Sequence, residues 1–223
     1  MLSLCFGLTQ GASAVWKDYS DNTNVFRFKR NEGMKIALTF DDGPNHVYTE
    51  QILDILKENE VHGTFFVIGE NAKIYPDLIA REIAEGHEVG NHTYHHPHLK
   101  KLTKEAVRQE ILLGEEALYE IDDYRPKLFR PPEGMCSEEI IACAEELDYN
   151  VILWSIDTLD WAHNSVENIT EMIMTNIRDG DIILFHDHVT KISPTPEVLK
   201  IIIPKLKEMG YSFVTVSELI GTR

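Results

Sequence analysis

From Lys35 almost to its end, the sequence alternates short β-branched or aromatic runs with longer segments of helical period. This alternation constrains the fold more than any other feature, because it is typical of a parallel sheet whose strands are joined by crossover helices. The helical segments end at glycines, and Ser137 and Ser165 stand where N-caps are needed. Seven strands are predicted, at residues 35–40, 64–68, 87–90, 127–130, 151–155, 181–185 and 212–216.

The number of residues limits how large such a barrel can be. The chain has 223 residues, of which 33–223 carry the alternation, somewhat fewer than the ~250 of an eight-unit barrel. We therefore predict a single α/β domain, a deformed (β/α) barrel with about seven parallel strands, with an open doubly wound sheet as the alternative. Both architectures bind ligands beyond the carboxyl ends of the strands.

Residues 1–32 are predicted to be a leader and lead-in to a domain at 33–223. The first eight residues are largely apolar and residues 12–14, Ala-Ser-Ala, match a signal-peptidase site, but no Lys or Arg precedes them. A secretory signal and a simple N-terminal extension are both open readings. The first places the protein outside the cell or in the cell envelope, and the second in the cytoplasm.

The charge balance excludes some partners. Lys and Arg number 21 against 37 Asp and Glu, a formal net charge of −16, which disfavours nucleic acid because such binding needs a basic face. No run approaches the ~18 apolar residues of a membrane span. The three cysteines cannot all pair, so no disulfide framework is expected, and a monomer is the default state of assembly.

Titratable or polar side chains follow five of the seven predicted strands. Because the carboxyl ends of parallel strands meet at one face of a barrel, we expect these groups to converge. They are Asp41-Asp42, Asn91-His92, Arg130, the segment 157–161, and His186-Asp187.

His92 and His96 are four residues apart, a spacing that places two imidazoles on one side of a turn and suits capture of a transition metal. A third ligand would come from Asp41 or Asp42. Two histidines and one carboxylate with an open coordination position are typical of a catalytic zinc-type site. The alternative is a solvated polar loop, which the nearby acidic pair disfavours.

Two adjacent Asp residues after a strand point in different directions, so one can bind metal while the other does different work. Arg130 is placed to neutralise a buried carboxylate there. His186 follows an apolar strand, and Asp160 is a plausible partner that would orient its imidazole and raise its pKa. A histidine with a raised pKa is a general acid at neutral pH.

These segments together resemble the five motifs of the polysaccharide deacetylases, the NodB-homology domain or carbohydrate esterase family four. The motifs occur in the family's order and span residues 39–186. They are TFDDGP at 39–44, HTYHH at 92–96, RPPEG at 130–134, DTLDW at 157–161 and LFH at 184–186.

The resemblance implies a metal-dependent hydrolase that removes acetyl groups from N-acetylated amino sugars of a polysaccharide, here peptidoglycan or a chitin-like oligomer. Zinc is the expected metal, with cobalt or another divalent ion as alternatives. By position in the motifs, the metal ligands would be Asp42, His92 and His96, the base Asp41 and the acid His186. Arg130 would orient the base and Asp160 would tune the acid. Pro132, Glu133, Trp161 and Leu184 would form the substrate and oxyanion pocket.

The third motif departs from the family pattern because Glu133 replaces its usual Tyr. The family uses the backbone N–H at this position toward the oxyanion, so the change affects substrate preference rather than the donor itself. Two other functions stay open from the sequence: an esterase acting on acetylated xylan or another O-acetyl glycan, and a catalytically silent glycan-binding domain. Against the second, every inferred catalytic and metal position holds a competent residue.

Overall fold

The computed structural model describes residues 22–30, 33–162, 164–189 and 192–222. The strands in this part of the chain are β1 Val25–Phe26, β2 Lys35–Asp41, β3 Thr64–Val67, β4 Glu88–Asn91, β5 Leu128–Phe129, β6 Asn150–Ile152, β7 Ile156–Asp157, β8 Ile182–His186 and β9 Ser212–Phe213. The α-helices are α1 Tyr48–Glu58, α2 Gly69–Ile74, α3 Pro76–Ala84, α4 Lys104–Asp122, α5 Glu138–Glu146, α6 Val166–Asn176, α7 Thr195–Glu208 and α8 Val216–Ile220. Short 3₁₀ helices are η1 Leu99–Lys101, η2 Pro132–Gly134 and η3 Asp160–Ala162.

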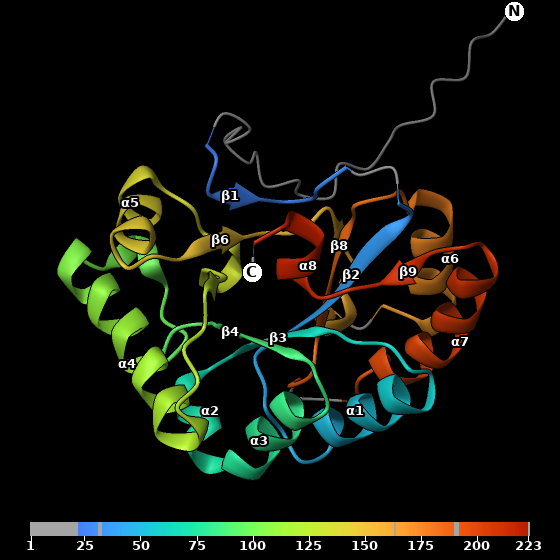
Figure 1. Ribbon diagram of the computed structural model, residues 1–223, viewed down its shortest axis with the longest axis horizontal. Helices are drawn as coiled ribbons and strands as arrows, with labels where there is room; N and C mark the ends of the chain where they lie inside the picture. Colours follow the sequence, from blue (N-terminus) through green and yellow to red (C-terminus); the bar gives the residue numbers. More distant parts are fainter. Residues whose placement is uncertain (1–21, 31–32, 163, 190–191, 223) are drawn as a thin grey trace, which may run out of the picture.

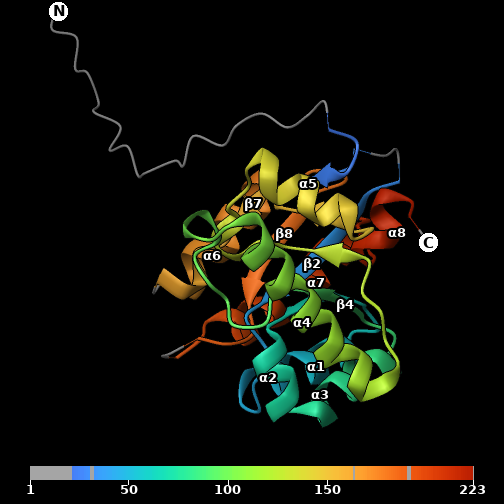
Figure 2. The ribbon, with the colours of Figure 1, turned by 90° about the vertical axis from the view of Figure 1, so that its left-hand side faces the viewer.

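The strands form one sheet in the order β1-β6-β5-β4-β3-β2-β8-β7, with β9 paired to β2, and every named pair is parallel. The sheet curls on itself and helices surround it, as Figure 1 shows along one axis and Figure 2 after a quarter turn. The predicted deformed barrel of parallel strands is confirmed.

The predicted strand at 151–155 overlaps only β6, and a second strand, β7, follows directly after the predicted range. β6 pairs with β5 and β7 pairs with β8, although only three residues separate Ile152 from Ile156. One bent segment therefore joins the two ends of the curled sheet. Periodicity alone could not show this bend, because β6 and β7 have only three and two residues, too few for a periodic signal.

β1 lies within the segment predicted as a lead-in. Val25 and Phe26 pair with Val151 and Ile152 of β6, so the sheet takes in residues before position 33. A two-residue strand in a polar context carries too little periodicity to be predicted. The expected leader, residues 1–14, lies outside the described residues.

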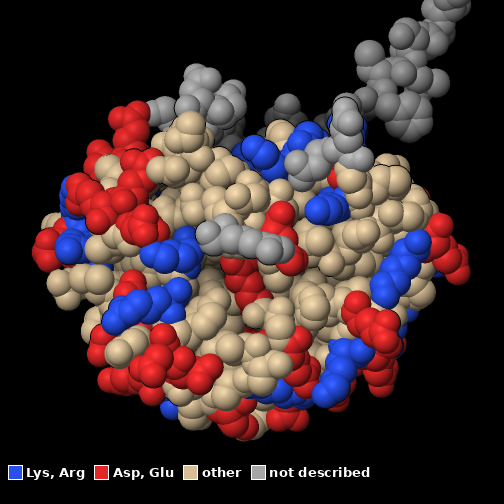
Figure 3. All heavy atoms as spheres, viewed as in Figure 1, with Lys and Arg blue, Asp and Glu red and all other residues tan. Residues whose placement is uncertain are grey.

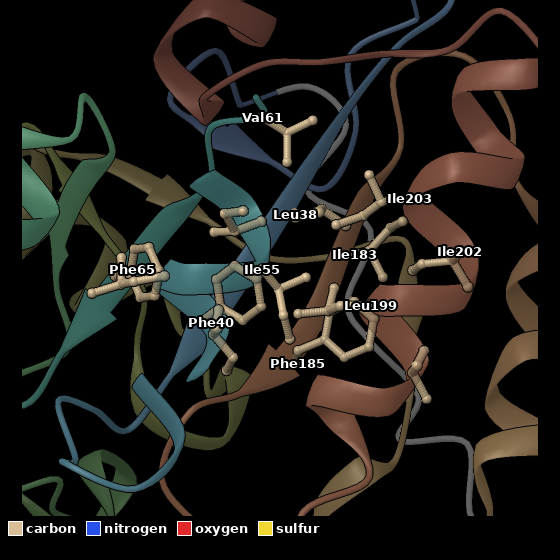
Figure 4. Close-up of a cluster of buried hydrophobic side chains, with 14 of the residues drawn as sticks. Leu38, Phe40, Ile55, Val61, Phe65, Ile183, Phe185, Leu199, Ile202 and Ile203 are labelled. Carbon is tan, nitrogen blue, oxygen red and sulfur yellow. The ribbon is translucent and has the colours of Figure 1, made fainter. Parts of the chain in front are cut away.

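β2 shows how the sequence separates the two faces of the sheet. Ile36, Leu38 and Phe40 face the helices, where they pack with residues of α1 and α7 in the cluster drawn in Figure 4. The alternate residue Ala37 belongs to a different buried cluster, with Phe66 and Leu184. The period of two therefore places Thr39 and Asp41 on the inner side, which prepares the site.

The helix boundaries follow the predicted capping residues in two cases. The side chains of Ser137 and Ser165 accept hydrogen bonds from the backbone N–H groups of Ile140 and Asn168. A proline inside a helical segment, such as Pro204, favours a kink or an early end of the helix. α7 nevertheless continues through Pro204 to Glu208. Several buried apolar residues of α7 hold this helix on the sheet, and such packing can offset the lost backbone bond.

No helix in the described ranges combines the length and apolar character needed to cross a bilayer. On the face shown in Figure 3, the Lys and Arg side chains are interspersed among Asp and Glu rather than gathered into one patch.

Candidate active site

The ends of β2, β4, β5 and β8 bring the predicted functional side chains to one place. Asp41 is the last residue of β2 and stands in register with His186, the last residue of β8. Asn91 ends β4 and is paired with Phe129 of β5, so that His92 and Arg130 follow neighbouring strands. The predicted convergence of these strand ends is therefore present.

Asp42, His92 and His96 offer three ligand atoms that lie within 4.8 Å of one another. The Nε2 atoms of His92 and His96 lie 3.4 and 3.3 Å from Oδ1 of Asp42. That oxygen is buried and makes no hydrogen bond. Two imidazole nitrogens converging on an orphaned carboxylate oxygen fit a divalent cation of the zinc type.

A hydrogen bond at Nδ1 fixes the orientation of the His92 ring. Its Nδ1 donates a hydrogen bond to the backbone carbonyl of Arg130 at 2.7 Å, which leaves Nε2 as the atom facing Asp42. Metal-binding histidines are commonly held in this way, because the second hydrogen bond selects the tautomer and the ring orientation.

The loop that carries the two histidines is not the helical turn that the spacing suggested. Thr93 and His96 both have left-handed backbone angles, with φ of 70° and 55°. Asn91 Oδ1 accepts from the Thr93 N–H, and Thr93 Oγ1 accepts from the His96 N–H. These side-chain bonds hold a strained loop that brings the imidazole rings within 5.0 Å of each other.

Two residues of this cluster, Asp42 and His96, have perturbed pKa values. Burial alone would raise the pKa of Asp42, but its polar contact with His92 and the charges of the nearby histidines outweigh burial and lower it to about 2. Burial and the neighbouring His92 lower the pKa of His96. Both shifts favour the forms that bind metal, an ionised carboxylate and a neutral imidazole.

Asp41 is held by Arg130 inside the barrel. Arg130 Nη1 donates to Asp41 Oδ1 at 2.6 Å and to Thr39 Oγ1 at 2.9 Å. The second carboxylate oxygen of Asp41, Oδ2, lies 3.8 Å from Nε2 of His92. Asp41 therefore has one oxygen fixed by the arginine and the other facing the three-residue cluster.

His186 is held by Asp160, as predicted. Its Nδ1 lies 2.7 Å from Asp160 Oδ1, and its backbone N–H donates to Asp160 Oδ2 at 2.8 Å. Thr195 Oγ1 and the Trp161 N–H also donate to this carboxylate. Asp160 thus has four hydrogen bonds that fix it against the imidazole.

The pKa of His186 is raised to about 9. Burial alone would lower it, but the hydrogen bond and charge of Asp160, with the charges of Asp42 and Asp41, outweigh that effect. At neutral pH this imidazole carries a proton that it can donate.

The predicted pocket residues differ in their surroundings. Pro132 and Leu184 are buried, whereas Trp161 and Glu133 expose more than half of the side chain. Glu133 has a left-handed backbone with φ of 56°, and its carboxylate lies 3.3 Å from Nδ1 of His98.

The remaining imidazole of the HTYHH motif does not join the three-residue cluster. His95 Nδ1 lies 2.9 Å from Glu110 Oε1, and its backbone N–H donates to the same carboxylate. This contact on α4 separates it from the two histidines whose Nε2 atoms meet at Asp42.

The sequence reasoning missed residues that support the site. Asn91 caps the histidine loop and Thr195 bonds Asp160, and Asp187 is buried next to the turn that carries Asp42. Asn91 and Asp187 lie at the ends of predicted strands, but nothing in the sequence assigns them a role. Thr195 had no sequence signal, because it reaches Asp160 across 35 residues.

This arrangement has the parts of a hydrolase assisted by a divalent cation. The sequence model of the polysaccharide deacetylase family matches residues 29–152. Among similar proteins is a peptidoglycan-N-acetylglucosamine deacetylase of Bacillus cereus, 42% identical over 83% of this chain and 87% of its own length. The chain belongs to the polysaccharide deacetylase family.

Two solved structures show the range of this likeness. The Bc1960 peptidoglycan N-acetylglucosamine deacetylase superposes with a TM-score of 0.90 at 36% identity, covering 93% of this chain and 99% of its own. BA3943 from Bacillus anthracis, described as a CE4 family pseudoenzyme, superposes with a TM-score of 0.82 at 28% identity, covering 88% and 68%. Because both share the fold, the residues of the site must carry the argument for activity.

Proposed function

We propose that the protein hydrolyses the acetamide group of N-acetylated amino sugars in peptidoglycan, with a divalent cation held by Asp42, His92 and His96. The observation that carries this proposal is the buried Asp42 oxygen, which has no hydrogen bond and faces two imidazole nitrogens. The Asp41 carboxylate, held by Arg130, and the His186 imidazole, held by Asp160, belong to the same site. The similarity to peptidoglycan deacetylases supports the choice of polymer.

Zinc is the proposed cation, because two imidazoles and one carboxylate with an open position are a common donor set for catalytic zinc. When bound, such a cation activates water and polarises the acetyl carbonyl. The other catalytic tasks fall to side chains of this chain.

Asp41 is the proposed base. Arg130 fixes its Oδ1, so that Oδ2 can accept the proton of the attacking water. The arginine is itself held rigid, since Nε and Nη2 donate to the carbonyls of Ile152 and Leu153. A preoriented base loses little freedom when it takes a proton, which favours general-base catalysis.

His186 is the proposed acid. With Nδ1 bonded to Asp160, the proton on Nε2 is the one available to the departing amine. An amine leaves poorly as an anion, so this proton matters for an amide. The backbone N–H of Glu133 is the proposed oxyanion donor. Trp161 and Leu184 are proposed to bound the acetyl group, and Pro132 is proposed to belong to the same pocket.

The substrate places the proposed activity outside the cell or in the cell envelope. Acetate release from intact peptidoglycan, N-acetylglucosamine oligomers and acetylated xylan, each with and without added zinc, tests the proposal. Metal-dependent release from the N-acetylated substrates is expected. Release from xylan alone would make the protein an O-acetyl esterase, and no release from any substrate would contradict the proposed activity.

A further inference from the structure

Asp187 directly follows His186 and is almost completely buried, with 1% of its surface exposed. Its backbone N–H donates to the carbonyl of Asp41 at 3.1 Å. The end of β8 is thereby joined to the end of β2 at the point where Asp41 and Asp42 leave the sheet. None of the steps proposed above uses this carboxylate.

The Asp187 carboxylate packs directly against the turn that follows Asp42. A Cβ atom placed on Gly43 would lie 2.0 Å from Oδ2 of Asp187. Gly43 is not among the residues with positive φ, so no special backbone angle requires a glycine here. Glycine is needed instead because the carboxylate approaches the backbone so closely.

A hydrogen-bonded chain ties the same carboxylate to the start of α1. Thr49 Oγ1 donates to Asp187 Oδ2 at 2.6 Å and accepts from the Asn45 N–H at 2.7 Å. Thr49 is fully buried. Asp187 therefore contacts the turn at Gly43 and, through Thr49, at Asn45.

Asp42 needs such support because its own backbone is strained. Its φ is 76°, and a left-handed non-glycine residue persists only where its surroundings determine its position. On the other side, Asn71 Nδ2 donates to the Asp42 carbonyl and the Ile68 N–H donates to the Gly43 carbonyl. The turn is thus held from two directions.

We propose that Asp187 is a positioning residue that sets the place of the Asp42–Asn45 turn and thereby holds the Asp42 carboxylate opposite His92 and His96. It acts as a hydrogen-bonded wedge between the turn and Thr49. The inference rests on the proposed function only in taking Asp42 as a metal ligand.

Zinc affinity of the metal-free protein, measured by competition with a chromophoric chelator, tests this role without relying on activity. Asp187→Ala should weaken binding about 10-fold or more, the usual effect of losing a residue that supports a ligand. Asp187→Asn should stay within about 3-fold, because its amide oxygen still accepts from Thr49. The visible spectrum of bound cobalt should change in Asp187→Ala and persist in Asp187→Asn.

Asp181 provides the matched control. It is a buried carboxylate directly before β8, at the opposite end of the strand from Asp187, where it accepts hydrogen bonds from Ser155 Oγ and the Arg178 N–H. Asp181→Ala therefore removes a buried carboxylate without touching the turn. Its zinc affinity should equal that of the wild type. Unchanged zinc affinity in Asp187→Ala, or equal losses of zinc affinity in Asp187→Ala and Asp187→Asn, would contradict the proposed positioning role of Asp187.

Two further comparisons test the proposal, the first of them even if Asp187→Ala fails to fold. Thr49→Val removes the donor at nearly constant volume and should weaken zinc binding. Thr49→Ser keeps the hydroxyl and should bind zinc like the wild type. Gly43→Ala should raise the unfolding equilibrium constant of the metal-free protein more in the wild type than in Asp187→Ala, by more than ~5-fold, as for residues in contact. In Asp187→Asn, which fills the same space, it should act as it does in the wild type. Equal zinc affinity in the two Thr49 variants, or additive effects at positions 43 and 187, would count against the proposal.

These measurements separate the two proposals. A protein that releases no acetate but follows the expected zinc-affinity pattern would retain the positioning role and lose the deacetylase function. A protein that releases acetate in a metal-dependent way, but whose zinc affinity is the same in the Asp187 and Thr49 variants as in the wild type, would retain the deacetylase function and lose the positioning role.

Discussion

Oδ1 of Asp41 lies 2.6 Å from Nη1 of Arg130, and both side chains are buried inside the barrel. The guanidinium also lies over the ring of Phe66, with its carbon 4.0 Å from the ring centroid. A buried ion pair is a poor source of stability because both charges lose water. Its presence beside Asp42, His92 and His96 is better explained by the need to fix Asp41, the proposed base.

The two adjacent aspartates should separate metal binding from turnover. Asp41→Asn is expected to lower acetate release by ~10²–10⁴-fold, the usual contribution of a general base, with zinc affinity nearly unchanged. Asp42→Asn should weaken zinc affinity itself, because it removes a ligand charge. Zinc content after dialysis and acetate release check both variants. Equal loss of zinc in the two would show that the roles are wrongly divided.

Loss of Arg130 should destabilise the fold. Arg130→Met leaves Asp41 buried without its cation, which is expected to cost ~3–5 kcal/mol of the free energy of unfolding. Urea denaturation measures this cost, and adding Asp41→Asn should recover part of it because the stranded charge is removed. Lys127→Met, which breaks the exposed pair with Asp148, is the control and should change stability far less. Similar losses in both would mean that burial of the Asp41 pair has no special cost.

The sequence predicted the site better than it predicted the edges of the sheet. Asp41, His92, Arg130 and His186 follow strands with clear apolar periodicity, and parallel strands necessarily bring such ends together. β1 is too short for a periodic signal, and the bend between β6 and β7 depends on which neighbour each half pairs with. Pairing partners are a tertiary property that a local pattern does not encode.

The same distinction holds within the site. The spacing of His92 and His96 was sufficient to predict that their imidazoles lie together, but the left-handed angles at Thr93 and His96 accompany hydrogen bonds to Asn91 and within the loop. The partnership of Thr195 with Asp160 joins α7 to η3. Contacts of this kind become visible only after the helices have been placed on the sheet.

Metal dependence should follow the imidazoles that meet at Asp42. A chelator is expected to abolish acetate release, and added zinc or cobalt to restore it. His92→Ala should weaken zinc affinity strongly, because it removes a ligand. His95→Ala should keep zinc affinity, because that imidazole is bonded to Glu110 instead. Full activity in a metal-free preparation would falsify the proposed mechanism, and zinc loss in His95→Ala would reassign the ligands.

The titration of His186 should depend on Asp160. In the metal-free protein, the imidazole resonances of His186 are expected to titrate with a pKa of about 9. Asp160→Asn removes the charge that stabilises the imidazolium, so burial should then bring this pKa down toward or below the usual ~6.5. NMR titration of the two proteins measures the shift.

The sign of this shift fixes two further observables. Because the folded pKa of His186 exceeds its unfolded value, the pair stabilises the fold fully below about pH 6.5 and this contribution is lost as pH rises through about 9. In the rate profile, loss of the His186 proton forms the alkaline limb, which should move to lower pH in Asp160→Asn. His186→Ala should slow amide substrates more than an activated acetyl ester, whose leaving group departs without a proton. An unmoved alkaline limb would remove Asp160 from the mechanism, and equal losses on both substrates would leave His186 as a residue that only binds substrate.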